Sequence, residues 1–191
     1  MNAPSEVPRG TGQAIWQVLT RTGDTISGLK LGQDSPEAES LGDGVRATAL
    51  IQDTHLIPGL WKIDGYTKTA KLITDNFEVI PGDIYNDPED RAANFYQFPY
   101  DWRRDNRASA HILKKLIDKR LQCWRKKSGA ADAKVILMAH SMGGLAARAW
   151  WRRHGREGRV AGLVTLGTPH AGTVMAFAAP MLNARQMRQI G

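Results

Sequence analysis

The residues of this chain with the clearest potential for chemistry surround Ser141, in the run AHSMGG at 139–144. The run follows a short apolar stretch and precedes a helical one, so Ser141 is expected at a turn from a strand into a helix. Such a turn lifts a serine hydroxyl above the edge of a sheet, where it can attack a carbonyl carbon. The pattern therefore predicts a nucleophile elbow with Ser141 as the catalytic nucleophile.

The neighbours of the serine fit this interpretation. In such a turn the residues two positions before and two after the nucleophile are expected to crowd each other, and Ala139 and Gly143 are both small. His140 is expected to point away from the serine as a packing residue. The backbone N–H of Met142 would lie at the positive end of the following helix, where it can receive an oxyanion. Alanine replaces the first glycine of the common G-x-S-x-G pattern, a change of one methyl group that the turn can accept.

A plainer arrangement fits the same residues. Serine is a frequent N-cap, so Ser141 could simply cap a helix that follows a core strand. The apolar stretch before the serine and the helical stretch after it favour the elbow over the cap, because an elbow requires both elements.

Other candidate residues carry weaker signals. His170 follows a predicted strand at the sheet edge where Ser141 should lie, and it is a candidate to line the pocket. Asp101, in the run YDWR at 100–103, is expected to form an ion pair or a turn rather than to act in catalysis. The spacing of the histidines suggests no metal ligands and the single Cys123 suggests no metal cluster, so neither a metal nor a cofactor is expected.

Hydrophobic periodicity indicates an α/β fold around these residues. Apolar residues at steps of three and four predict a helix over 109–127, and a second helix is predicted over 145–154. Continuous apolar runs predict strands over 134–139 and 160–166, buried on both faces of a parallel sheet. Alternation of strands and helices predicts a mostly parallel sheet flanked by helices with right-handed crossovers.

The residues before this region are less regular. We expect one domain over 1–191 in which 1–64 is irregular and rich in loops, followed by a short helix over 65–77. A turn is expected at Pro81-Gly82, and a strand over 94–98. Five tryptophans are expected as core or half-buried packing residues: Trp61, Trp102, Trp124, Trp150 and Trp151.

Length and composition are those of an ordinary globular domain. The chain has 191 residues, of which 42% are hydrophobic and 24% charged, which argues against disorder and against a coiled coil. No apolar run is long enough to span a bilayer, and no secretory signal is visible. The expected location is therefore cytoplasmic, or secreted if the amino terminus is truncated.

The positive charge is concentrated in one stretch. The net charge is +7, and residues 103–159 hold 16 Lys or Arg against four Asp or Glu, a surplus of 12. Solvated helix faces explain this surplus most simply, because the charges alternate with apolar residues at helical spacing. An anionic membrane surface is an alternative partner. Binding to nucleic acid is not expected, because charge is the only feature that favours it.

Several segments together resemble the lecithin:cholesterol acyltransferase family of α/β-hydrolase proteins, in the form carried by bacterial homologues. The resemblance implies a partial α/β-hydrolase fold and a lipid-directed serine acyltransferase or acylhydrolase that works through an acyl-Ser141 intermediate. It also implies a lipid ester as substrate and an alcohol or water as acceptor, without a cofactor. The segments that carry it are PGLW at 58–61 with Gly65-Tyr66, FPYDWR at 98–103, AHSMGGL at 139–145 and LGTPH at 166–170.

Two departures from the family pattern limit this resemblance. The family begins with an apolar strand and a Pro-Gly-x-x-Gly-Ser loop that supplies a second oxyanion donor, and no counterpart is found here. The family's triad acid and histidine come after the segment that ends at His170, and we assign neither to a residue of this chain. The chain is therefore expected to be incomplete at both ends. A catalytically inactive fragment or a domain that binds a lipid or a partner protein is the alternative function.

Overall fold

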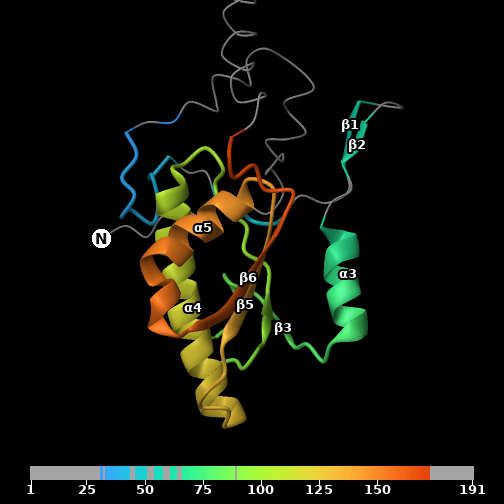
Figure 1. Ribbon diagram of the computed structural model, residues 1–191, viewed down its shortest axis with the longest axis vertical. Helices are drawn as coiled ribbons and strands as arrows, with labels where there is room; N and C mark the ends of the chain where they lie inside the picture. The colour runs from blue at the N-terminus through green and yellow to red at the C-terminus, as the bar shows by residue number, and fades with distance from the viewer. Residues whose placement is uncertain are drawn as a thin grey trace, which may run out of the picture.

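The core of the molecule is a parallel pair of strands with two helices on one face (Figure 1). The computed structural model describes residues 31, 33–43, 46–50, 54–57, 61–63, 66–88 and 90–172. The α/β fold predicted from the sequence is confirmed, with short parallel strands flanked by helices.

Strands β5 (Val135–His140) and β6 (Val160–Leu166) form the parallel pair. Helix α5 (Gly143–His154) and the short 3-10 helix η1 (Gly155–Glu157) connect them. The β-branched and apolar residues of both strands favour extended backbone, and a parallel pair requires a crossover element between its strands. The predicted strands over 134–139 and 160–166 and the helix over 145–154 are confirmed to within two residues.

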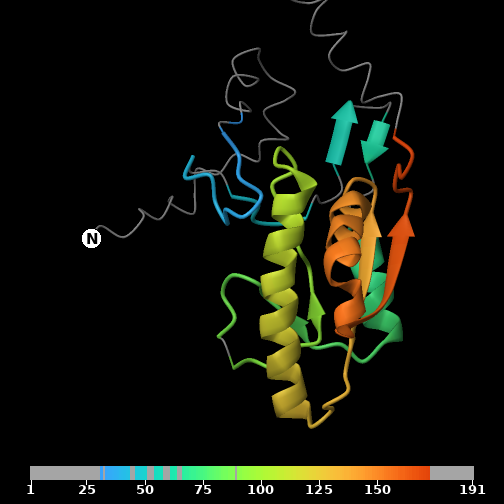
Figure 2. The ribbon, with the colours of Figure 1, turned by 60° about the vertical axis from the view of Figure 1, so that its left-hand side comes forward.

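Helix α4 (Asn106–Ser128) is the longest helix among the described residues and packs beside α5 (Figure 2). The carboxylate of Asp105 accepts the backbone N–H of Arg107 at 2.8 Å and caps the first turn. Gly129 ends the helix in the left-handed conformation, with φ of 76°. The predicted helix over 109–127 is confirmed, and the Asp105 cap explains why it begins three residues earlier.

The hydrophobic core lies between these two helices and the sheet. Trp150 of α5 is completely buried, and Leu113 and Ile117 of α4 pack with it. Val135 and Leu137 of β5 contact this cluster from the sheet. The packing role predicted for Trp150 is confirmed. Trp151, by contrast, is 36% exposed, because it lies one residue further round the helix and points outward.

The other face of the sheet is open, which corrects the expectation that both strands are buried on both faces. Ile136 and Met138 of β5 are 68% and 49% exposed, and Val164 and Leu166 of β6 are each 42% exposed. The residues of a strand alternate between the two faces, and α4 and α5 both cover the same one. Among the described helices, α3 is the one on the open side, and it buries no residue (Figure 2).

The elements before α4 are short. Helix α3 (Thr67–Asn76) confirms the helix predicted over 65–77. Pro81–Gly82, expected as a turn, instead forms strand β3, which pairs in parallel with β4 (Phe95–Tyr96). Gly82 permits this pairing, since a Cβ there would lie 2.2 Å from a ring carbon of Tyr96. An unpredicted antiparallel hairpin of β1 (Thr54–Ile57) and β2 (Trp61–Ile63) lies within the region expected to be irregular.

Two buried arginines fasten the early part of the chain to the start of α4. The guanidinium of Arg104 lies 2.7 Å from the carboxylate of Asp34, and both side chains are largely buried. Arg103 pairs with Asp101 at 2.6 Å and with Asp43 at 2.8 Å. The ion pair expected for Asp101 is therefore confirmed. Within the part of the chain that the structure describes, no helix is both long and apolar enough to cross a membrane.

Candidate active site

Ser141 lies in the sharp turn between β5 and α5. Its φ is 51°, and it is the one non-glycine residue with positive φ in the described part of the chain. Its backbone N–H donates to the carbonyl of Leu166 at 2.8 Å, and its own carbonyl accepts the N–H of Gly144 at 3.0 Å. The side chain is exposed. The left-handed conformation costs a residue with a Cβ about 1 to 2 kcal/mol, and these two hydrogen bonds hold it in place.

Ser141 does not cap the helix, so the plainer arrangement considered for it is not the one observed. The N-cap position of α5 is Met142, whose φ and ψ are already helical, and no side chain bonds to the first helical N–H groups. The serine therefore ends the strand in a left-handed turn and leaves its hydroxyl in solvent.

The turn also places two backbone N–H groups beside the serine. Met142 and Gly143 begin a helix, and the first N–H groups of a helix have no carbonyl one turn earlier to bind. The helix dipole adds partial positive charge at this end. An anion that forms next to Ser141 would meet these donors, so the geometry is compatible with the oxyanion role predicted for Met142.

The two glycines after Met142 make different contacts. A Cβ on Gly143 would meet the ring of Tyr100 at an ordinary 3.7 Å, and Ala139 is not among the atoms that it would approach. A Cβ on Gly144 would lie 1.9 Å from the hydroxyl oxygen of Thr168. The crowding expected between Ala139 and Gly143 is therefore wrong as the steric reason for small residues here. The tight contact lies between Gly144 and the loop after β6.

His140 is exposed, which corrects its assignment as a packing residue. It is the last residue of β5 and lies on the open face, because the covered face is lined by Val135, Leu137 and Ala139. Its Nδ1 lies 3.0 Å from the hydroxyl of Tyr66, and the two rings meet edge to face with centroids 5.6 Å apart. Because Tyr66 immediately precedes α3, this hydrogen bond ties α3 to the turn that carries the serine.

Two tyrosines near the turn stay protonated at neutral pH. Burial raises the pKa of Tyr100 to about 12, with a smaller contribution from Tyr66. Burial also raises the pKa of Tyr66 above its usual value. Both phenols therefore remain hydrogen-bond donors, and Tyr100 packs against the start of α5 at Gly143.

His170 lies on the α5 side of the sheet. Its Nε2 is 3.2 Å from the hydroxyl of Thr165 in β6, and its Nδ1 is 3.5 Å from the guanidinium of Arg148 in α5. These contacts place it in the loop after β6. Its predicted role in lining the pocket stays a prediction.

No proton acceptor for Ser141 is found in the described part of the chain. No described histidine or carboxylate lies within hydrogen-bonding distance of the serine hydroxyl, and the rings of His140 and His170 bind other partners. The described residues also include no group of three His, Cys, Asp or Glu side chains suited to a metal ion. The described residues thus place an exposed serine beside backbone N–H groups at a helix start, with no histidine or carboxylate in hydrogen-bonding distance of its hydroxyl.

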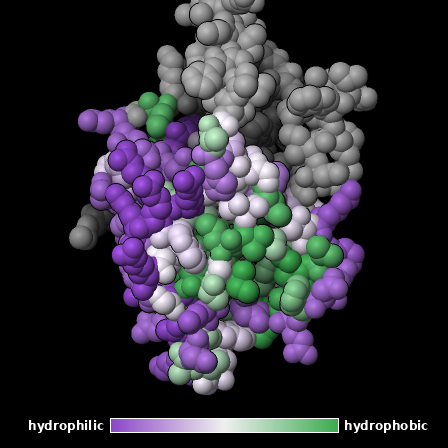
Figure 3. Space-filling view, in the orientation of Figure 1, coloured by the Kyte–Doolittle hydropathy of each residue, from purple (hydrophilic) through white to green (hydrophobic). Residues whose placement is uncertain are grey.

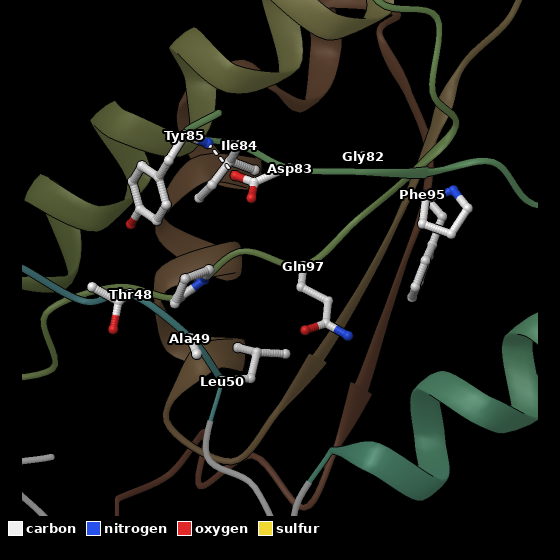
Figure 4. A pocket seen from close by; sticks show the side chains of 11 residues that line it. Thr48, Ala49, Leu50, Gly82, Asp83, Ile84, Tyr85, Phe95 and Gln97 are labelled. Atoms are coloured by element: carbon white, nitrogen blue, oxygen red, sulfur yellow. Dashed lines mark hydrogen bonds between the residues drawn. The ribbon is translucent and has the colours of Figure 1, made fainter. Parts of the chain in front are cut away.

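A cavity of about 190 Å³ lies apart from this turn (Figure 4). It is lined by residues of β3 and β4 and by the segment Thr48 to Leu50, and its polar residues include Asp83, Tyr85 and Gln97. No residue between β5 and α5 borders it. It therefore does not form the binding site for a substrate of Ser141.

Residues 103–187 match the family model of PGAP1, described as a PGAP1-like alpha/beta domain. This segment contains α4, β5, the turn at Ser141, α5 and β6. The α/β architecture of the described residues is that of a partial α/β-hydrolase fold. No curated protein and no solved structure matches the sequence, and nothing in the comparisons singles out the lecithin:cholesterol acyltransferase family.

Three residues contact this turn in ways that the sequence analysis did not predict, although all three lie in segments that carry the family resemblance. Tyr66 lies far before Ser141 in the sequence, and Thr168 lies in the loop after β6. The backbone of Leu166 binds the serine only after β5 and β6 have paired. The glycine pair before Leu145 is the one available signal. A second glycine inside a first helical turn indicates that another segment approaches its backbone closely.

Proposed function

We propose that this chain carries the nucleophile of a serine acylhydrolase or acyltransferase that acts on lipid esters. The observation that carries the proposal is the exposed Ser141 in a left-handed turn between a parallel strand and a helix. The match of residues 103–187 to a PGAP1-like alpha/beta domain supports a hydrolase-like function. The resemblance of four segments to the lecithin:cholesterol acyltransferase family supports lipid acyl groups as the substrate.

In the proposed reaction the hydroxyl oxygen of Ser141 attacks the carbonyl carbon of the ester. The carbonyl oxygen becomes an oxyanion that the N–H of Met142 stabilises at the start of α5. The carbon–oxygen bond to the alcohol group breaks, the alcohol leaves with a proton, and an acyl-serine ester remains. Water or a second alcohol then attacks this ester and releases the acid or a new ester. In this proposal a histidine outside this chain takes the serine proton.

Covalent labelling with a fluorophosphonate tests the nucleophile directly. We expect the probe to label the chain at Ser141 and the Ser141→Ala variant to remain unlabelled. Ser128→Ala is the matched control, because Ser128 is also exposed but its hydroxyl donates to the carbonyl of Trp124 within α4. Labelling that persists in Ser141→Ala, or none in the parent chain, would contradict the proposal.

A second candidate function is a non-catalytic domain that keeps the turn and binds a lipid or a partner protein. The absence of a base near Ser141 among the described residues favours it. The same probe separates the candidates, because an unassisted serine hydroxyl reacts slowly. Without triad partners an enzyme of this type retains only about 10³ to 10⁴-fold acceleration over water. Labelling no faster than that of Ser128 would support the binding domain.

A further inference from the structure

The outward face of α5 is basic and lacks any acidic residue. Gly143–His154 contains no Asp or Glu, and the side chains of Arg148, Arg152 and, in η1, Arg156 are exposed. None of these three arginines forms an ion pair with another described residue. We call Arg148, Trp151, Arg152 and Arg156 the α5 stripe.

Other basic helices of the molecule are arranged differently. In α4 the ammonium of Lys114 lies 2.5 Å from the carboxylate of Asp118, and Lys115 pairs with Glu39. In α3 Lys71 pairs with Asp75 one turn away at 2.8 Å. On these faces several of the cations have a counterion within one turn or on a neighbouring segment. The α5 stripe has no ion-pair partner among the described residues, so the positive charges of its arginines are not neutralised within that part of the chain.

An aromatic side chain lies within this stripe. Trp151 is 36% exposed, and its indole rests on the backbone of Gly155, where a Cβ would approach it to 3.1 Å. Figure 3 shows the hydrophilic surface over α5 directly beside a hydrophobic patch over β5 and β6. Arginines around a half-exposed tryptophan match the headgroup region of a membrane, where cations meet phosphates and an indole lies at the boundary.

We infer that the α5 stripe docks onto an anionic phospholipid bilayer. The charge complementarity argues for this partner, and the half-exposed indole of Trp151 beside the arginines suits the boundary between headgroups and acyl chains. Arg148 lies two turns after Ser141, about 10 Å along the helix axis. A bilayer bound along the stripe therefore lies beside the nucleophile turn. The docking stands on the stripe alone, and its use to deliver a lipid ester rests on the proposed function.

Vesicle sedimentation with the full chain tests the docking. We expect the chain to sediment with phosphatidylserine-containing vesicles, less with pure phosphatidylcholine, and less as salt rises. Arg148→Gln with Arg152→Gln should lower the partition coefficient about thirtyfold, since each cation near such a surface contributes about fivefold. The matched control is Lys126→Gln with Lys127→Gln at the end of α4, which removes the same charge and should retain most of the binding.

Further measurements distinguish a bilayer from free phosphate and from nucleic acid as the partner. Trp151→Ala should weaken the binding that remains at high salt, because that part depends on the indole. Inorganic phosphate should not compete at the same ionic strength, and duplex DNA should compete weakly. The inference is overturned if the arginine pair and the lysine pair lose binding equally, if pure phosphatidylcholine binds as well, or if DNA displaces the vesicles.

Ser141→Ala keeps this test distinct from that of the proposed function. The variant should sediment like the parent chain, because the serine is not part of the stripe. Vesicle binding without probe labelling would leave the docking surface in place and reject the nucleophile. Labelling of Ser141 without vesicle binding would do the reverse.

Discussion

At the scale of single residues, Ser141 combines a hydroxyl that could act as a nucleophile with backbone strain. A Cβ in the left-handed region is unfavourable, and the structure holds this residue there through the carbonyls of Leu166 and of Ser141 itself. Strain of this kind is retained where a turn must project a side chain. The turn could be predicted from the sequence alone, whereas one of its two hydrogen bonds comes from Leu166, in a strand that ends 25 residues later.

The backbone strain predicts an order of stability among substitutions of Ser141. The free energy of unfolding of Ser141→Gly should be about 1 kcal/mol higher than that of Ser141→Ala, because glycine adopts φ of 51° without a Cβ penalty. Urea unfolding followed by circular dichroism measures the difference. Equal midpoints for the two variants would show that the turn relaxes in solution.

The two glycines after Met142 should differ in how much stability the chain loses when each is replaced by alanine. Gly144→Ala should destabilise the chain by about 1 to 3 kcal/mol, because the new methyl group would overlap Thr168. Gly143→Ala should change stability little, since its Cβ would meet Tyr100 at van der Waals distance. Thermal unfolding of both variants makes the comparison. The packing argument fails if Gly143→Ala is the more damaging of the two.

At the scale of elements, the start of α4 depends on a charged cap. The side chain of Arg107 and then its backbone N–H hold the pKa of Asp105 down to about 2. A depressed carboxyl pKa means that the ionised cap stabilises the fold fully above about pH 4, the ordinary pKa range of an aspartate. This contribution is lost as the pH falls toward 2, where the carboxylate takes up a proton in the folded state.

The cap predicts a pH-dependent effect of substitution. Asp105→Ala should lower the free energy of unfolding by about 1 kcal/mol near neutral pH, and Asp105→Asn by less, because an amide oxygen still accepts the N–H of Arg107. The gap between the parent chain and Asp105→Asn should narrow between pH 4 and 2. Urea titrations across this range test it, and a gap independent of pH would rule out the ionised cap.

The long periodic elements could be predicted from the sequence, and the short ones could not. Helix α4 and strands β5 and β6 have hydrophobic patterns over six or more residues, and patterns of that length indicate the type of element. Strand β3 has two residues, Pro81 and Gly82, whose types normally indicate a turn. It becomes a strand because β4 offers parallel partners and Tyr96 fills the space above Gly82. Such a pairing is a tertiary effect with no local signal.

The exposure of the sheet shows the same limit. A continuous apolar run predicts a strand without showing what covers each face. The register of β5 and β6 places Met138 opposite Val164, both exposed, while Leu137 and Leu163 face the helices. The position of Ser141 could be predicted because it depends on neighbours in sequence. The contacts of Tyr66 and Thr168 with the turn could not be, because they depend on how distant segments dock.

At the scale of the whole molecule, one of the two buried arginines, Arg104, holds residues 34–39 of the early part of the chain. Arg104 binds the carboxylate of Asp34 and three backbone carbonyls, those of Ser35, Ala38 and Glu39. The side-chain hydrogen bond from Arg104 lowers the pKa of Asp34. Removal of one partner of a buried pair leaves an unpaired charge, which typically costs about 3 to 5 kcal/mol.

These contacts of Arg104 predict that its replacement costs more stability than replacement of the nearby Arg107. Arg104→Met should destabilise the chain by several kcal/mol, roughly the cost of stranding a buried carboxylate, and should expose residues 33–43 to protease. Arg107→Met is the control, because its pair with Asp105 is exposed and is worth at most about 1 kcal/mol. Limited proteolysis with mass spectrometry locates the cleavage. Equal resistance of both variants would show that the segment does not depend on Arg104.

The open sheet face predicts that the chain associates in solution. A parallel pair with one bare apolar face buries less than such strands normally do, and exposed patches of this kind promote association. We expect concentration-dependent association of the chain, measured by light scattering, and its reduction by Ile136→Lys with Val164→Lys, at positions 68% and 42% exposed. Leu72→Lys with Phe77→Lys is the control, since these residues are as exposed but lie in α3 and just after it.

The effect of these lysines on folding decides what the face contacts. If Ile136 and Val164 face water in the folded chain, lysine at both positions should leave the circular dichroism spectrum and the unfolding midpoint nearly unchanged. Leu137→Ala, on the covered face, should cost about 2 to 5 kcal/mol because it opens a cavity beside the core. A loss from the lysine pair as large as that from Leu137→Ala would mean that another part of the chain covers this face. Association through it would then be excluded.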